Sequence, residues 1–273
     1  MIEYSVRDVV SCVAGSGSAR QLYRGVAQLV ARFVRDEEVR GSNPRTPTMK
    51  NPQIILASAS IGRKTLLQKL GVPFSIQVSS VDEEEIVDPD LHKMLALRAR
   101  AKAEDVATKI IQLSNSQINT NYPIEKNTRR YTLDAKRFLI IAADSMAIFN
   151  NQTFGKARDK KHAKTIVQAL NGQTHDFVTA TTIISLGNLG DIGHLSETSR
   201  WENITRTAVT CRKMSEAEID EYVSRYDFTR FAAAYALNET PWNWITKIDG
   251  SYTNVIGLPF EVVLPIFRKL SLL

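Results

Sequence analysis

Residues Phe138 to Asp144 read Phe-Leu-Ile-Ile-Ala-Ala-Asp, and the apolar run continues beyond Asp144 as far as Phe149. A continuous apolar run of this length predicts a long strand or a strand pair, apolar enough to lie at the centre of a sheet. A carboxylate in such a strand is costly to bury unless it binds something. Asp144 is therefore a candidate metal ligand or general base, and the alternative at this point is a carboxylate that caps a neighbouring loop.

The segments on either side of this strand alternate between strand and helix patterns, which predicts a mixed α/β domain. Residues 114–136 are polar and predict a loop or insertion longer than usual connections. Residues 187–193 also predict a loop. A terminal helix begins at Pro259, and Pro265 should kink or shorten it. The other expected strands are 54–57, 74–78, 175–186, 201–211, 231–237 and 242–248, and the expected helices are 62–70, 91–113, 159–170 and 216–225.

The first 48 residues differ in composition from the rest. They are rich in Arg, punctuated by Gly and Ser, and end in the turn-rich run 41–48. Residues 25–44 resemble the conceptual translation of a bacterial transfer-RNA gene, in which case the protein starts at Met49. The alternative is an organellar presequence, although the acidic residues of the segment argue against it. We therefore expect 1–48 to be an extension and 49–273 to be the functional domain.

Composition excludes several classes of protein. Hydrophobic residues are 43% and charged residues 23% of the 273, as in ordinary globular proteins. The two cysteines, Cys12 and Cys211, exclude a disulfide framework and fit a cytoplasmic location. No apolar run approaches the roughly 20 residues that a membrane span needs. A pI of about 9.3 suggests RNA binding, but half of the net charge of +6 lies in residues 1–50, so nucleic acid is not an expected partner.

The absence of several motifs narrows the chemistry further. The four histidines show no His-Glu-x-x-His spacing, and the sequence has neither a Gly-x-Ser-x-Gly elbow nor a Walker A loop. The sequence therefore gives no support for a zinc-dependent hydrolase, for a serine or cysteine nucleophile, or for a P-loop enzyme that hydrolyses nucleoside triphosphates.

Small hydroxyl residues between the first strand and the first helix form a candidate anion site. At such a turn, backbone N–H groups and the helix dipole favour a negative ligand, so Ser58 and Ser60 are candidates. Arg63, in the first helical turn, could bind a phosphate. The alternative is a serine that caps the helix and an arginine that faces solvent.

Further charged residues could face the same ligand. Arg98 and Lys102 are four residues apart on one face of the long helix, and Lys156 lies just beyond the Asp144 strand. The acidic run 82–85 contains Glu83, which could help to hold a cation. The alternative for each of these groups is a solvated surface.

Taken together, five stretches resemble the Maf family, also called septum formation inhibitor proteins. The similarity runs in the right order over about residues 53–270, and its C-terminal block is the most specific part. The stretches are 56–63 (Leu-Ala-Ser-Ala-Ser-Ile-Gly-Arg), 102–103 (Lys-Ala), 143–145 (Ala-Asp-Ser), 155–156 (Gly-Lys) and 250–259 (Gly-Ser-Tyr-Thr-Asn-Val-Ile-Gly-Leu-Pro).

The resemblance implies an α/β fold with a Maf/ITPase-like mixed sheet, flanking helices and two lobes around a deep cleft, often as a homodimer. It also implies hydrolysis of a pyrimidine or modified nucleoside triphosphate to a monophosphate and pyrophosphate, with Mg²⁺ or Mn²⁺. Asp144 matches the catalytic aspartate that activates water. Arg63, Lys102 and Lys156 match the cations around the triphosphate. With them we expect Ser58 and Ser60 to bind substrate, and Asp144 and Glu83 to hold the metal.

Three positions depart from the family pattern and are predicted to set specificity. Gly62 replaces an arginine or, in the methyl-GTP branch, a tryptophan. Ser145 replaces threonine or glutamine, and Asn238 replaces the glutamine near the base. The last two changes favour dTTP or UTP over 7-methyl-GTP. The alternative function is a nucleotide-binding regulator of cell division with little turnover, which the altered Gly62 and Asn238 motivate.

Overall fold

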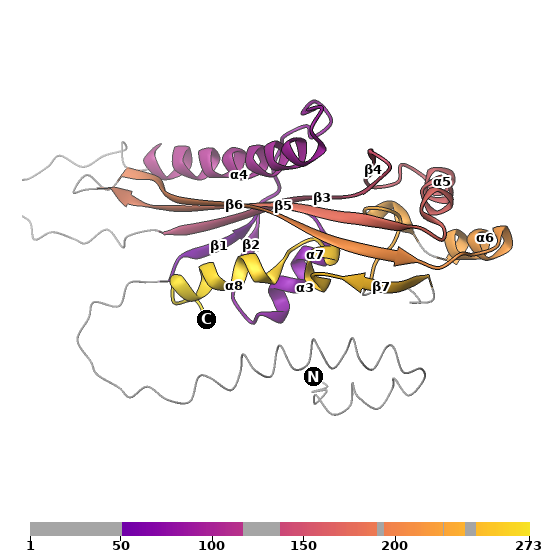
Figure 1. Ribbon diagram of the computed structural model, residues 1–273. Coiled ribbons are helices and arrows are strands. Elements are labelled where there is room, and N and C mark those ends of the chain that lie inside the picture. Colours follow the sequence, from indigo (N-terminus) through magenta and orange to yellow (C-terminus); the bar gives the residue numbers. More distant parts are fainter. Residues whose placement is uncertain (1–50, 117–136, 190–193, 226, 238–243) are drawn as a thin grey trace, which may run out of the picture. The chain divides into compact units, whose positions relative to one another are not determined.

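The apolar run that starts at Phe138 forms β3 (Phe138–Phe149), a single long strand in the middle of a mixed sheet (Figure 1). The computed structural model describes residues 51–116, 137–189, 194–225, 227–237 and 244–273. Within them the strand order is β2-β1-β3-β5-β6-β7, and β4 pairs with the end of β3. β3 is parallel to β1 and antiparallel to β5. The other strands are β1 (Gln53–Leu56), β2 (Phe74–Ile76), β4 (Gln152–Phe154), β5 (Thr174–Leu189), β6 (His194–Cys211) and β7 (Ile245–Asp249).

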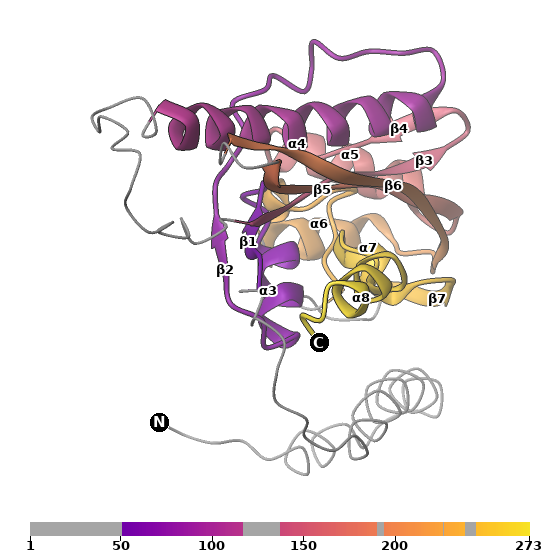
Figure 2. The ribbon, with the colours of Figure 1, turned by 90° about the vertical axis from the view of Figure 1, so that its left-hand side faces the viewer.

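Helices lie on both sides of this sheet. α4 runs along one face, while α3, α7 and α8 lie on the other (Figures 1 and 2). None of the described helices is both long and apolar enough to cross a membrane. The helices are α3 (Ile61–Lys69), α4 (Leu91–Ser116), α5 (Lys160–Leu170), α6 (Glu216–Arg225), α7 (Tyr252–Ile256) and α8 (Phe260–Lys269), with a 3-10 turn, η1, at Phe228–Arg230.

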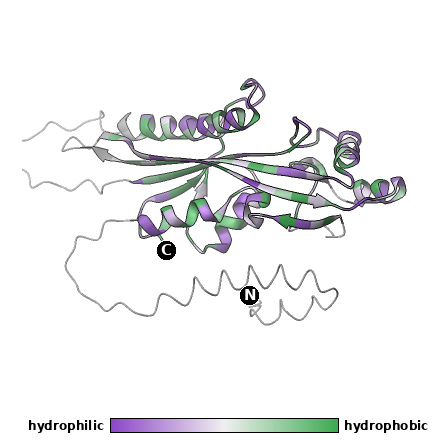
Figure 3. Cartoon of the chain, viewed as in Figure 1, coloured by the Kyte–Doolittle hydropathy of each residue, from purple (hydrophilic) through white to green (hydrophobic). Residues whose placement is uncertain are grey.

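β3 is buried on both faces, as its sequence predicts. Leu139 and Ile141 belong to the core formed with α3 and α8, whereas Ile140 and Ala142 belong to the core formed with α4. Successive side chains of a strand point to opposite faces, so a strand covered on both sides must be apolar throughout. Figure 3 shows hydrophobic residues along the strands and on the inward sides of the helices.

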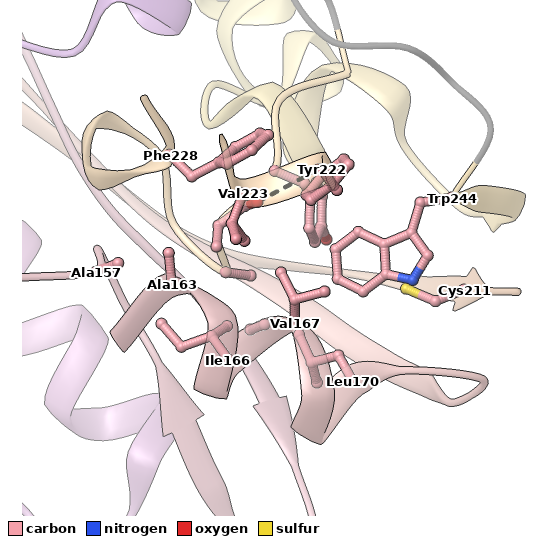
Figure 4. Close-up of a cluster of buried hydrophobic side chains, with 14 of the residues drawn as sticks. Ala157, Ala163, Ile166, Val167, Leu170, Cys211, Tyr222, Val223, Phe228 and Trp244 are labelled. Atoms are coloured by element: carbon pink, nitrogen blue, oxygen red, sulfur yellow. Dashed lines mark hydrogen bonds between the residues drawn. The ribbon is translucent and has the colours of Figure 1, made fainter. Parts of the chain in front are cut away.

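A further core lies between α5, α6 and the ends of β5 and β6 (Figure 4). Trp244 is completely buried in it, and the rings of Tyr222 and Phe228 stack with 4.3 Å between their centroids. Cys211 is also buried here as a free thiol. The helix α5 presents four apolar residues to this core, Ala163, Ile166, Val167 and Leu170.

The strand predicted for residues 231–237 is wrong. Ala233 and Ala234 both have left-handed backbone conformations, with φ of 57° and 55°, which a strand cannot contain. A single antiparallel bridge joins Ala232 to Lys156, and Ala233 N donates to the carbonyl of Gly155 at 2.9 Å. The segment is therefore a turn that is attached to the chain just after β4.

Two further predictions need correction. The loop predicted for 187–193 is shorter, because β5 continues to Leu189 and β6 begins at His194. Pro265 does not shorten the terminal helix, since α8 continues through it to Lys269. Because a proline has no backbone N–H, Pro265 cannot bond the carbonyl of Glu261 four residues earlier. Both residues are exposed. The predicted strand 242–248 is β7, which begins at Ile245.

The predicted loop or insertion 114–136 begins later, because α4 continues to Ser116. Its remainder, 117–136, and the predicted extension 1–48 lie outside the described residues, so both stay predictions. The mixed α/β class is confirmed, and two lobes around a deep cleft also stay a prediction.

Candidate active site

The candidate site lies at the carboxyl end of β1, where β3 continues beyond it. β1 pairs with β3 only as far as Ile141, so Asp144 and Ser145 lie past the paired region. Asp144 shares the α4 face of the sheet with Ile140 and Ala142, and Ser145 lies on the opposite face. The carboxyl ends of parallel strands are the usual place for ligands in α/β sheets. At the carboxyl end of β1, side chains from both faces of the sheet can therefore contact one ligand.

Asp144 is paired with a buried lysine from α4. Lys102 Nζ lies 2.8 Å from Asp144 Oδ1, and it donates a longer bond of 3.4 Å to the carbonyl of Ala143. Both side chains belong to residues that are only 6% exposed. The helix predicted at 91–113 and the strand predicted at 138–149 thus bring two of the predicted site residues together.

Glu83 joins the same lysine from the loop between β2 and α4. Its Oε2 lies 2.7 Å from Lys102 Nζ, and its side chain is 45% exposed. One ammonium therefore bridges a buried carboxylate and a partly exposed one. Glu83 is the member of the acidic run 82–85 that reaches the site.

The loop that carries Glu83 is fastened to α4 by Asp105. The carboxylate of Asp105 accepts hydrogen bonds from Ser79 Oγ at 3.0 Å and from Ser80 N at 2.9 Å. Burial is the largest single influence on the pKa of Asp105 and raises it, but hydrogen bonds from Lys109, Ser80 and Ser79 together lower it to about 2. Arg98 Nε also donates to the carbonyl of Ile86 at 3.0 Å, so Arg98 helps to hold this loop, and its facing the ligand stays a prediction.

The pKa of Asp144 lies below its ordinary value. Burial raises it, but the charges of Lys102 and Arg63 and the hydrogen bond from Lys102 lower it more. The carboxylate is therefore ionised at neutral pH. Its Oδ2 is buried and has no hydrogen-bond partner among the described residues. That oxygen is available to accept a proton or to bind a cation.

Arg63 occupies the other face of the sheet and is held at all three of its nitrogen atoms. Nε donates to the carbonyl of Gly257 at 2.8 Å, Nη1 to Ser58 Oγ at 2.8 Å, and Nη2 to Ser145 Oγ at 2.9 Å. The residue is 8% exposed. Burial lowers the pKa of Arg63 below its ordinary value, although the charges of Asp144 and Glu83 act in the opposite direction. The alternative of a solvent-facing arginine is therefore wrong.

The two serines of the predicted anion site support Arg63. Ser60 is the N-cap of α3, and its Oγ accepts from Arg63 N at 3.5 Å. Ser58 Oγ accepts from Ser60 N at 3.2 Å as well as from the guanidinium. Both hydroxyls thus have partners within the chain, and their binding of substrate stays a prediction.

The remaining predicted residues lie in different positions. Lys156 is exposed, and its side chain forms no ion pair or hydrogen bond with another described residue, although its backbone bridges Ala232. Gly62 is buried where α3 meets α7, and a Cβ there would lie 2.7 Å from the carbonyl oxygen of Ile256. Asn238 lies outside the described residues.

Sequence reasoning missed the residues that bind Arg63 from far along the chain. Gly257, in the Gly-Leu-Pro block, accepts from Nε, and a Cβ at this position would lie 3.4 Å from both Arg63 Nε and Ser145 Oγ. The φ of Gly257 is 109°, a conformation that favours glycine. The sequence shows Gly257 as a glycine in the 250–259 stretch, but only the fold shows that it binds Arg63.

Comparison with known proteins identifies the family. A family model described as Maf-like protein matches residues 53–270. The dTTP/UTP pyrophosphatase of Agathobacter rectalis is 31% identical, over 80% of this chain and 98% of that protein. The dTTP/UTP pyrophosphatase of Treponema denticola is 30% identical, over 80% of this chain and 96% of that protein. The nucleoside triphosphate pyrophosphatase of Trichodesmium erythraeum is 29% identical, over 81% and 93%. The chain belongs to the Maf family.

Proposed function

We propose that this protein is a nucleoside triphosphate pyrophosphatase that hydrolyses dTTP or UTP to the monophosphate and pyrophosphate. The observation that carries the proposal is the buried, ionised Asp144, which has one bonded and one free oxygen, between the cations of Lys102 and Arg63. Relatives named dTTP/UTP pyrophosphatase cover the same part of the chain and support this substrate class.

Asp144 is the proposed general base. Lys102 holds Oδ1 and so fixes the orientation of the carboxylate, which leaves Oδ2 to accept a proton from a water molecule that attacks the α-phosphorus. The lowered pKa keeps the carboxylate in the charged form that this role requires.

Arg63 is the proposed ligand of the phosphate chain. A guanidinium has five N–H groups, and Arg63 uses one from each nitrogen within the protein. One N–H on each terminal nitrogen remains for phosphate oxygens, where negative charge develops as pyrophosphate leaves. A guanidinium fixed in advance loses little entropy when it binds a phosphate.

The site as it stands has no excess of positive charge. Arg63 and Lys102 carry two positive charges, and Asp144 and Glu83 carry two negative ones. A triphosphate adds several more negative charges, so the site needs further cations. Lys156 is the nearest predicted source along the chain, and a metal ion is the other.

The residues present fit a divalent cation. The free Oδ2 of Asp144 and the carboxylate of Glu83 are hard oxygen donors of the kind that Mg²⁺ and Mn²⁺ prefer, and both carboxylates approach the same lysine. Among the described residues no cluster of three or more acidic, histidine or cysteine side chains forms a complete protein cage. Mg²⁺ sites of this type normally use one or two carboxylates together with substrate phosphates. Mg²⁺ or Mn²⁺ held by Asp144 and Glu83 would supply positive charge to the phosphate oxygens.

A panel of nucleoside triphosphates with pyrophosphate detection tests the proposal. With Mg²⁺ present, dTTP and UTP should be the fastest substrates, and 7-methyl-GTP should be slower. A faster reaction with 7-methyl-GTP contradicts the substrate assignment. Binding of dTTP without release of pyrophosphate contradicts the enzymatic function and supports the regulator alternative.

We also propose a cytoplasmic location and a homodimeric assembly. We place the protein in the cytoplasm, which the buried free thiol of Cys211 supports, since reduced thiols are usual there. Light scattering after size-exclusion chromatography tests the homodimer that the family resemblance implies.

A further inference from the structure

A chain of hydroxyl groups runs from the Arg63 guanidinium into the interior. Arg63 Nη2 donates to Ser145 Oγ at 2.9 Å, and Ser145 Oγ lies 2.9 Å from Thr179 Oγ1. Thr179 Oγ1 in turn donates to the backbone carbonyl of Asn254 at 3.2 Å. Ser145 and Thr179 are direct partners in the β3–β5 ladder, so their side chains stand next to each other on one face.

Proton counting sets the direction of every bond in this chain. The carbonyl of Asn254 can only accept, so the single hydroxyl proton of Thr179 points to it. Thr179 then has no proton for Ser145, and Ser145 must donate its own proton to Thr179 Oγ1. The Ser145 oxygen consequently presents a lone pair to Arg63, which can only donate. All the donors point away from Arg63, and hydrogen bonds aligned in this way strengthen one another.

The far end of the chain is fixed by Asn254. This residue is completely buried in α7. Its Nδ2 donates to the carbonyl of Phe177 on β5 and to Thr207 Oγ1 on β6, both at 3.0 Å. Its backbone N donates to Ser251 Oγ at 3.1 Å, the N-cap of α7. The carbonyl that accepts from Thr179 is therefore held by three elements.

We propose that Thr179 is a positioning residue for the phosphate-binding arginine. Thr179 is completely buried and reaches the Arg63 guanidinium through Ser145, while its own proton binds the Asn254 carbonyl. By accepting a hydrogen bond from Ser145, it holds the Ser145 proton away from Arg63, so that a lone pair of Ser145 Oγ faces Nη2 and fixes one arm of the guanidinium. The inference rests on the proposed function of Arg63 as a triphosphate ligand. It also gives Ser145 a role in holding Arg63, in addition to its predicted role in choosing the base.

The decisive variant is Thr179→Val, which keeps the shape of the side chain and removes its donor and acceptor. Its matched control is Thr181→Val. Thr181 lies two residues along β5 on the same face, is 1% exposed, and its hydroxyl has no partner among the described residues. Both variants remove one buried hydroxyl, but only Thr179→Val breaks the chain to Arg63. Thr179→Ser should restore the chain.

Calorimetry of inorganic tripolyphosphate binding, with Mg²⁺ present, measures the affinity of the phosphate site alone, because this ligand has no nucleobase and needs no turnover. We expect Thr179→Val to weaken this binding by about five- to tenfold, the usual effect of one lost hydrogen bond. The KM for dTTP should rise by a similar factor, while kcat changes less. Thr181→Val and Thr179→Ser should bind like the wild type. In a Ser145→Ala background, Thr179→Val should have a much smaller effect on binding, because the hydroxyl link to Arg63 is already cut and only the bond to the Asn254 carbonyl remains to be lost.

Several results overturn the inference. Equal losses of binding in Thr179→Val and Thr181→Val mean that the threonines have only a structural role. A fully additive loss of binding on introducing Thr179→Val into the Ser145→Ala background means the same. If the wild-type protein does not bind tripolyphosphate, the proposed phosphate site is wrong and the inference fails with it. A wild-type protein that binds tripolyphosphate but hydrolyses no nucleoside triphosphate contradicts the proposed function alone, and the comparison of the two threonine variants still stands.

Discussion

Lys102 Nζ lies 2.8 Å from Asp144 Oδ1, and this ion pair is almost completely buried between α4 and β3. A buried pair of this kind is weak evidence of stability, because both charges lose their hydration. It is better explained by function, since Asp144 also keeps a free buried oxygen. The pair holds the carboxylate in one orientation and keeps it ionised.

Replacing Asp144 by asparagine should lower turnover by about 10²–10⁴-fold, the usual contribution of a general base. The amide has a similar volume, and Lys102 retains Glu83 as a partner, so the fold should persist. Steady-state rates and circular dichroism measure the two effects. Glu202→Gln is a control, because Glu202 is a partly exposed carboxylate whose ion pairs are with Arg100 and Arg200. A variant at Asp144 that keeps more than half of the wild-type rate shows that the carboxylate is structural.

Replacing Lys102 by methionine should move the acid limb of the pH profile of kcat/KM to higher pH. Burial is the largest influence on the pKa of Asp144 and raises it, and Lys102 is the main influence that lowers it. Without the lysine, Asp144 should therefore take up a proton at higher pH. Lys93→Met is the control, because Lys93 is an exposed lysine of the same helix that pairs with Asp88 in the preceding loop. A rate loss with an unmoved acid limb contradicts this account.

The same pair should stabilise the wild type in a defined pH range. The pKa of Asp144 is lower in the folded state than its ordinary value of 3.8. Its contribution to stability is therefore complete above that value and is lost as the pH falls through the folded pKa. Unfolding by urea between pH 6 and pH 3 should show a smaller loss of stability in Lys102→Met than in the wild type. An equal loss in both proteins means that the pair does not contribute.

Replacing Glu83 by glutamine should raise the Mg²⁺ concentration needed for half-maximal activity. The change removes one of the two negative charges proposed to hold the cation, at a partly exposed position where the fold should tolerate it. Titration of activity with Mg²⁺ and with Mn²⁺ measures the shift. Glu84→Gln, in the same acidic run, should leave the Mg²⁺ requirement unchanged. Identical titrations for Glu83→Gln and the wild type exclude Glu83 as a ligand.

Replacing Gly62 by alanine should destabilise the protein by about 1–3 kcal/mol, because the new Cβ would lie 2.7 Å from a backbone oxygen and α3 would have to move from α7. Thermal unfolding measures the change. Gly155→Ala is the matched control, since a Cβ at Gly155 meets nothing within 4 Å. Equal melting temperatures for the two variants contradict the close packing of α3 on α7.

The parts of the fold that follow from local pattern could be predicted from the sequence. β3 is apolar throughout because it is covered on both faces, and Asp144 stands out because it interrupts that run. The segment 231–237 could not be predicted, since its strand-like composition is overridden by a turn with two left-handed alanines. Pro265 likewise misled, because a proline on the exposed side of α8 does not end the helix.

The sequence singled out Asp144, Lys102, Glu83 and Arg63 but could not show how their side chains connect. Arg63 is separated from Ser145 by 82 positions and from Gly257 by 194 positions. No local pattern reports contacts over such distances, so the burial of Arg63 and the roles of Thr179 and Gly257 needed the fold. The predicted extension is open to a direct test, in which a shortened chain that begins at Met49 should keep the melting temperature and activity of the full chain.

The central claim is that the site directs a water molecule to the α-phosphorus of a nucleoside triphosphate. Hydrolysis of dTTP in ¹⁸O-labelled water, followed by phosphorus NMR and mass spectrometry, tests it most directly. The account predicts dTMP and pyrophosphate as the first products, with the label in dTMP. Label in the pyrophosphate, or release of orthophosphate with dTDP, would contradict it.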